Sequence, residues 1–170
     1  MNNKVLIAIG VVSLVVIAGL IGLTMVLTPE NKGAYNAAVR FINSAGTFDD
    51  EAAYALLTPE MQAYVDATCD DGRVSACIAD YIPPEWGNLV RDGGAVFRRA
   101  IRDGDAFDVQ LVATYERDQG FAGVCIYHRV VEIAPDDWRV AAWSGFVSCD
   151  EPNSGLNGLR QADAPNRVAP

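Results

Sequence analysis

The sequence predicts an α+β protein, with one N-terminal transmembrane helix followed by a domain of helices packed on an antiparallel sheet. Three observations lead to this prediction. Residues 5–27 carry no charge, residues 34–68 have apolar side chains at helical spacing, and residues 95–149 alternate between apolar and polar side chains. Because the helices come first and the strands follow, the pattern favours an α+β domain over an alternating β/α fold.

The apolar stretch at the N-terminus reads "VLIAIGVVSLVVIAGLIGLTMVL" and covers residues 5–27. As a helix it would be about 35 Å long, enough to cross a hydrocarbon core of about 30 Å. A cleaved signal peptide is the alternative, but its apolar region would be shorter and would end in a small-x-small site. We therefore expect a retained anchor, with residues 1–4 as a short cytoplasmic N-terminus because Lys4 precedes the span. Residues 28–33 would be a linker.

The four cysteines follow from this topology, since a domain beyond the span would lie in the oxidising periplasm or extracellular space. Cys69 and Cys77 flank a short acidic turn. Cys125 and Cys149 lie at about equal distances from the turn "APDD", so they would face each other across a hairpin. The preferred pairing of the three possible is 69 with 77 and 125 with 149. Four buried free thiols are the alternative.

The charge of the external part argues against some partners. Without Lys4, twelve basic residues stand against 22 acidic ones, a formal charge of −10. Nucleic acid and anionic lipid surfaces are therefore poor partners. A basic protein is permitted, although an acidic composition is also typical of a soluble domain.

Helical signals fill the first half of the domain. The segment "KGAYNAAVRFINSAG" predicts a helix that ends at Gly46 with a left-handed cap. Asp49 or Asp50 can cap a helix through Leu57, and Thr58 followed by proline can start the next one. Apolar residues of this region, Phe48 among them, lie on one side and are expected to cover the sheet.

Strand signals fill the second half. In "DAFDVQLVATYER" the residues from Phe107 to Tyr115 alternate, which places Asp108 and Gln110 on a polar face. The turns "RDGD", "ERDQG" and "APDD" separate four such runs, as in an antiparallel meander. Residues 150–170 have no periodicity and are expected to be an extended or disordered tail.

The order "FINSAGTFDDEAAYALLTPEMQAYV" followed by a four-stranded meander resembles the nuclear transport factor 2-like superfamily, also called SnoaL-like or cystatin-like. The resemblance covers about residues 34–149. It implies a cone-shaped domain with a pocket between the helices and the concave face of a curved sheet. Members use this pocket as an active site, as a ligand cavity, or only as part of a protein-binding scaffold, and fold does not choose among these.

Few residues suggest catalysis. His128, the single histidine, shares a strand face with Ile126 and Val130 and is expected to be structural. Ketosteroid-isomerase-like members use an aspartate base and a tyrosine-centred oxyanion hole. No aspartate matches that base, so we expect no catalytic residue, no cofactor and no metal site. The candidate pocket-lining residues, which fit equally well as core, are Tyr54, Tyr64, Tyr115, Tyr127 and Trp143.

Two segments could contact partners. In "YIPPEWGNLV", Tyr81, Trp86 and Leu89 would form either a partner contact or a lid over the pocket. In the span, Ala18 and Gly22 have small-xxx-small spacing, although passive anchoring would need no such contact. The resulting expectation is a membrane-anchored extracytoplasmic accessory or scaffold subunit of a membrane protein complex. The alternative is a tethered small-molecule-binding protein or an isomerase-like enzyme.

Overall fold

A computed structural model describes residues 10, 12–19, 32–87, 89–91, 94–150 and 164–170, in two compact units, Met1–Glu30 and Asn31–Pro170. In the first unit, residues 12–19 are helical. No helix among the described residues is both long enough and apolar enough to cross a membrane. Most of the predicted span, including Gly22, lies outside the described residues, as do residues 1–4 and 28–31.

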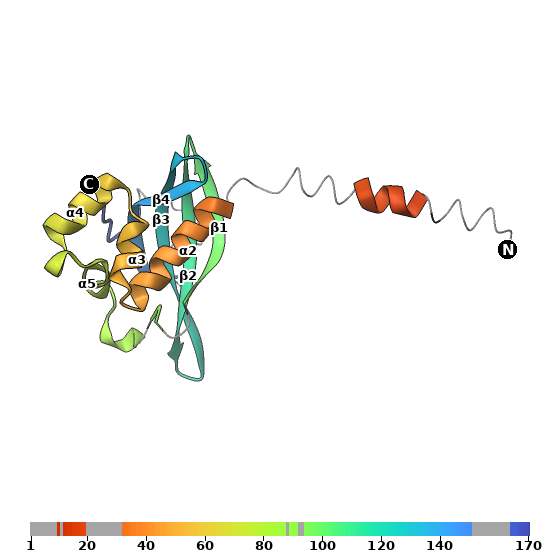
Figure 1. Ribbon diagram of the computed structural model, residues 1–170. Helices are drawn as coiled ribbons and strands as arrows, with labels where there is room; N and C mark the ends of the chain where they lie inside the picture. The colour runs from red at the N-terminus through yellow and green to blue at the C-terminus, as the bar shows by residue number, and fades with distance from the viewer. Residues whose placement is uncertain (1–9, 11, 20–31, 88, 92–93, 151–163) are drawn as a thin grey trace. The chain divides into compact units, whose positions relative to one another are not determined.

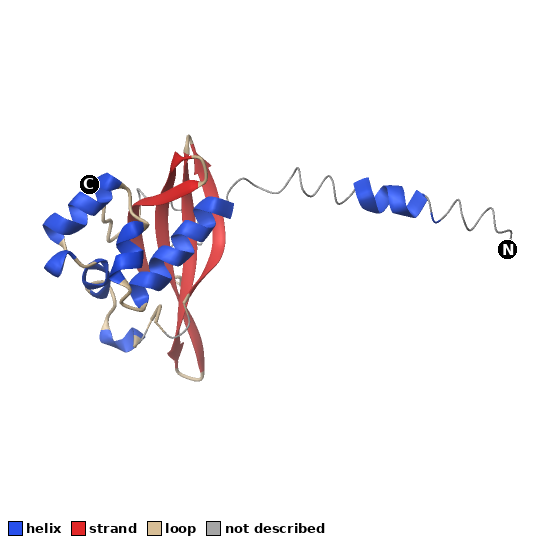
Figure 2. Cartoon of the chain, in the orientation of Figure 1, coloured by secondary structure: helices blue, strands red, loops and turns tan. Residues whose placement is uncertain are grey.

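The second unit is α+β, with its helices before its strands, as predicted (Figures 1 and 2). The helices are α2 (Lys32–Gly46), α3 (Asp50–Ala55), α4 (Pro59–Thr68) and α5 (Val74–Ala79), with the 3₁₀ turns η1 (Asp70–Gly72) and η2 (Pro84–Trp86). The strands are β1 (Ala95–Asp103), β2 (Ala106–Arg117), β3 (Gly120–Ala134) and β4 (Asp137–Ser148). Helix α2 therefore includes Lys32 and Gly33, which were expected in the linker.

The sheet is an antiparallel meander in the order β1-β2-β3-β4. Its three hairpins turn where the Asp/Gly signals predict, and each turn contains one residue in the left-handed region: Gly104, Asp118 or Asp136. In β1 the register shifts between Phe97 and Arg99, which marks a β-bulge.

The outer edge of β4 is occupied by two other segments. Residue Val140 exchanges backbone hydrogen bonds of 3.0 and 2.8 Å with the connection from α3 to α4. Further along, Trp143 and Val168 exchange a pair of 3.1 and 2.8 Å. The described end of the tail, residues 164–170, is thus extended and attached to the sheet, whereas residues 151–163 lie outside the described residues.

Helix α2 lies across one face of the sheet and contacts all four strands, while α3, α4 and α5 gather on the β4 side (Figure 1). The core forms between α2 and this inner face. Its fully buried members include Phe41, Ile42, Leu111, Ile126, Val140 and Trp143. The alternation predicted for β2 is confirmed on this face, because Val109, Leu111 and Ala113 are all buried there.

The helix caps confirm two predictions and correct a third. Asp49 accepts a hydrogen bond from Ala52 N, and Thr58 accepts one from Met61 N. Gly46, however, is helical, and the left-handed residue at the end of α2 is Phe48, with φ 62°. Glycine is needed at position 46 because Val90 packs closely against it, and a Cβ there would lie 2.6 Å from Val90 Cγ1.

Both predicted disulfides are present, Cys69–Cys77 and Cys125–Cys149, with Cα–Cα distances of 5.2 and 5.3 Å. Because of a bulge after Cys125, that residue pairs with Val147 in the sheet, and Cys149 follows the end of β4. The two disulfides suggest an oxidising, extracellular environment.

Gly145 lies in β4 with φ 100°, and a Cβ there would meet Cys125 O at 2.6 Å. Gly145→Ala should therefore destabilise the domain by about 3 kcal/mol or more, from backbone strain and the clash together. Gly120→Ala is the matched control, because that glycine of β3 has no atom within 4 Å of its ideal Cβ position. Urea denaturation of both variants measures the difference, and equal midpoints would contradict this account.

The two disulfides should differ in their contribution to stability. The loop closed by Cys125 and Cys149 is longer, so replacing both by alanine should cost about 3.5 kcal/mol, against about 2.5 kcal/mol for the pair Cys69 and Cys77. Denaturant titration of the two double variants gives the two losses. A larger loss for the shorter loop would be inconsistent with the chain-entropy explanation.

Candidate functional site

The predicted pocket between helices and sheet is occupied by packed side chains at its centre. Phe41 of α2 lies 5.2 Å from Trp143 of β4 and 5.5 Å from His128 of β3, measured between ring centroids. All three side chains are fully buried. Trp143 is therefore part of the core at this place rather than the wall of an open cavity.

His128 has the inner-face position that the sequence predicts, next to Ile126 and Val130. Neither of its ring nitrogens has a hydrogen-bond partner among the described residues, and burial lowers its pKa to about 3. At neutral pH the imidazole is thus uncharged, and no group is placed to exchange a proton with it. These properties suit a structural histidine.

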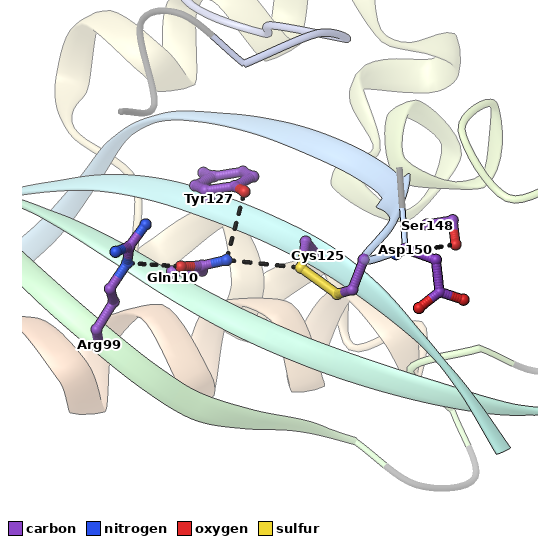
Figure 3. The surroundings of a disulfide bond; sticks show 7 residues. Arg99, Gln110, Cys125, Tyr127, Ser148 and Asp150 are labelled. Atoms are coloured by element: carbon purple, nitrogen blue, oxygen red, sulfur yellow. Dashed lines mark hydrogen bonds between the residues drawn. A yellow bond between two sulfur atoms is a disulfide. The ribbon is translucent and has the colours of Figure 1, made fainter. Parts of the chain in front are cut away.

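Tyr127 points away from the helices, which corrects its assignment as a pocket-lining residue. Its hydroxyl lies 3.3 Å from Gln110 Nε2, whose oxygen accepts a 2.8 Å hydrogen bond from Arg99 (Figure 3). The same amide nitrogen is 3.5 Å from the sulfur of Cys125. Gln110 is only 2% exposed, so the outer face of the sheet, which is polar as predicted, is buried here.

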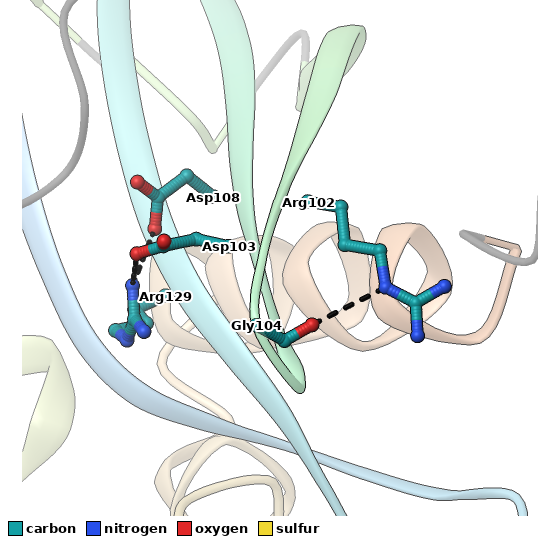
Figure 4. Close-up of polar contacts among 5 residues, drawn as sticks. All are labelled: Arg102, Asp103, Gly104, Asp108 and Arg129. Atoms are coloured by element: carbon teal, nitrogen blue, oxygen red, sulfur yellow. Dashed lines mark hydrogen bonds and ion pairs between the residues drawn. The ribbon is translucent and has the colours of Figure 1, made fainter.

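A second polar cluster lies further along the outer face. Arg129 contacts both Asp103, at 3.0 Å, and Asp108, at 3.2 Å (Figure 4). Asp108 is 4% exposed, and its pairing with the guanidinium compensates for that burial. The cluster links three strands, and it explains how the carboxylate of Asp108 can be buried on this face.

The remaining predicted aromatic residues make contacts within the domain. Tyr54 donates a 2.8 Å hydrogen bond to Asp66, and this contact raises the tyrosine pKa. Tyr115 stacks on Trp86, with ring centroids 5.8 Å apart. Tyr64 is half-buried against the core.

The segment expected to contact partners is largely packed onto the domain. Tyr81 stacks on Phe146 at 5.9 Å, and Trp86 on Tyr115. Leu89 is 2% exposed, which argues against its use as a partner contact and leaves the alternative of packing within the domain. Tyr81 and Trp86 thus pack on aromatic residues of β4 and β2, and both are only partly buried. Ala18 lies in the N-terminal helical segment.

A small apolar pocket opens beside this segment, and we call its surroundings the Phe48 surface. Its volume is about 190 Å³, and it is lined by Gly46, Phe48, Ala79, Ile82, Gly87, Leu89, Val90 and Arg91. Phe48 is 60% exposed, which corrects its predicted place in the core. The guanidinium of Arg91 lies 5.6 Å from the centre of the Phe48 ring.

A larger depression, the hairpin cleft, lies between α2, α3 and the turn joining β3 to β4. Its volume is about 480 Å³, and it is lined by Gly33, Asn36, Ala37, Arg40, Ala52, Ala55, Leu56, Asp136, Asp137, Trp138 and Arg139. Arg139 makes two hydrogen bonds to Asp137, and they hold the pKa of that carboxyl below its ordinary value. No periodicity in the sequence signals this site, because its walls come from segments about 100 residues apart.

Within the described part of the chain, no three His, Cys, Asp or Glu side chains are grouped so that they could hold a metal ion. Comparisons with models of protein families, with curated proteins and with solved structures find no match for this chain. The candidate sites therefore have to be judged on their own chemistry.

The burial of His128 predicts a pH dependence of stability. An unfolded histidine binds a proton below about pH 6.5, whereas the folded one stays neutral until about pH 3, so stability falls as the pH drops between these values. His128→Leu should remove this component, which is on the order of 2–3 kcal/mol at about pH 4.5. Urea denaturation of both proteins at about pH 7 and about pH 4.5 measures it. If the wild type and His128→Leu lost the same stability between the two pH values, the titration of carboxyl groups alone would explain the effect.

Proposed function

We propose that this chain is a non-catalytic accessory or scaffold subunit, anchored in a membrane by residues 5–27, that binds another subunit through the Phe48 surface. Its domain would lie on the periplasmic or extracellular side, in agreement with the two disulfides. The order of helices and strands supports the resemblance to the nuclear transport factor 2-like superfamily, which includes protein-binding scaffolds.

The observation that carries this proposal is the conformation and exposure of Phe48. Asp49 N bonds to Ser44 O at 2.9 Å and Phe48 N to Ala45 O at 3.2 Å, which is the Schellman pattern at the end of a helix. Phe48 holds the left-handed position in which glycine or asparagine is favoured, at a cost of about 1–2 kcal/mol. Its ring is 60% exposed and so gains little from burial within the domain in return. A residue that is unfavourable in both respects is best explained by binding.

The pocket next to Phe48 indicates what the partner offers. Its apolar lining and its volume of about 190 Å³ suit one aliphatic or aromatic side chain. Val90, a β-branched residue with φ 63°, is a second strained position in the same wall. Arg91 adds a positive charge at the rim of this pocket, in a domain whose net charge is negative. The partner segment would therefore present an apolar anchor next to a carboxylate.

The alternative, an isomerase-like enzyme or a small-molecule receptor using a conical pocket, has less support. Phe41, His128 and Trp143 occupy the centre of the interface in which that pocket would lie. Tyr127, a candidate pocket-lining residue, is on the other face of the sheet.

Phe48→Asn tests the proposal, because asparagine tolerates the left-handed conformation. The variant should be as stable as the wild type, or more stable by up to about 1 kcal/mol, yet it should lose its partner. The full-length chain is purified from its native membranes in mild detergent, and the particle mass is measured together with the thermal midpoint. We expect a wild-type particle larger than the chain itself and a smaller one for the variant.

Phe121→Asn is the matched control, since Phe121 is 76% exposed at the start of β3 and is not part of the Phe48 surface. It should leave the particle mass unchanged. A monomeric wild-type particle, equal effects of the two substitutions, or recovery of the chain in the soluble fraction would each count against the proposal.

A further inference from the structure

The hairpin cleft has the size and construction of a small-ligand site. Its volume of about 480 Å³ falls in the range of pockets that hold small molecules. The helices contribute small residues here, among them Gly33, Ala37 and Ala52, so the two helix surfaces leave space instead of filling it. A Cβ at Gly33 would lie 2.1 Å from Trp138 Nε1, so glycine allows the indole to lie directly against α2.

Trp138 provides a fixed aromatic wall. Its ring also packs on Phe107 of β2 at 5.6 Å, and the side chain stays half-buried in the cleft. An indole held in this way offers an apolar surface to a ligand at little cost in side-chain entropy.

The formal charges of the cleft cancel, because two arginines stand against two aspartates. Arg139 is paired with Asp137, and Arg40 on α2 faces the same space as Asp136 in the turn. Among the described residues, neither Arg40 nor Asp136 has a side-chain partner. With two guanidinium groups and two carboxylates, the cleft offers an anion or a cation as much repulsion as attraction, and the negative net charge of the domain adds to the repulsion of an anion. A neutral ligand avoids both penalties.

Such a ligand must also satisfy both donors and acceptors. The guanidinium of Arg40 donates, the carboxylate of Asp136 accepts, and the amide of Asn36 does both. Hydroxyl groups match all three, and a pyranose ring has an apolar C–H face that can lie against an indole. We propose that the hairpin cleft binds a neutral saccharide of one or two rings. Glycans are abundant outside the cytoplasm, the environment that the disulfides suggest.

The proposal is independent of the Phe48 surface, and it is tested with the full-length chain in a detergent that has no sugar headgroup. Maltose, cellobiose and N,N′-diacetylchitobiose are the probes, each at up to about 10 mM so that millimolar dissociation constants are detected. Saturation-transfer NMR reports binding. We expect at least one disaccharide to bind, and absence of binding by all three would overturn the proposal.

Variants locate the site. Asn36 and Arg40 are exposed on α2, so the double variant Asn36→Ala/Arg40→Ala should fold and should weaken binding at least tenfold. Arg117→Ala is the control and should bind normally. It removes an exposed guanidinium next to the turn between β2 and β3, at the end of β3 opposite to the cleft. Retained affinity in the double variant would place binding elsewhere. Tighter binding of glucuronate or glucosamine than of glucose would contradict the neutral assignment.

Discussion

The packing of α2 against the inner face of the sheet fixes the positions of both candidate surfaces. Phe41, near the middle of the helix, contacts the aromatic rings of β3 and β4, and the helix reaches all four strands. With 15 residues it is about 22 Å long. Gly33 in its first turn lines the hairpin cleft, and Phe48 follows its last turn. The two surfaces are thus held at opposite ends of one rigid element, and a molecule bound at one end leaves the other accessible.

Signals that are local in the sequence predicted local structure well. The caps at Asp49 and Thr58 and the three hairpin turns depend on neighbouring residues only, and the Cys125–Cys149 pairing depends on distance from a turn. The end of α2 differs because Gly46, which has the residue type expected of a left-handed cap, lies within the helix two residues before the left-handed position. Its role is set by Val90, 44 positions away, whose approach no local window reveals. The strained position then falls to Phe48, the residue that matters most for the proposed function.

The outer face of the sheet shows a second limit of pattern reasoning. Alternation correctly separated Val109 from Gln110, but it does not tell whether the polar face meets water or other polar side chains. Here the amide of Gln110 bridges Arg99 and Tyr127, and Arg129 pairs with Asp108. These contacts join residues from three strands, so they depend on register across the whole sheet. The hairpin cleft is equally non-local, because α2 and the last hairpin meet only in the folded domain.

The two edge strands of the sheet, β1 and β4, differ in what is bonded to them. The backbone of β4 is bonded to Leu56, Thr58 and the end of the tail, whereas β1 has only β2 as a strand partner among the residues that the structure describes. The edge of β1 is interrupted by the bulge after Phe97, and the strand carries three arginines, at positions 98, 99 and 102. A strand from another copy would meet a broken hydrogen-bonding repeat and like charges. Edge-to-edge growth of the amyloid kind between crowded molecules of this chain is thereby disfavoured at β1.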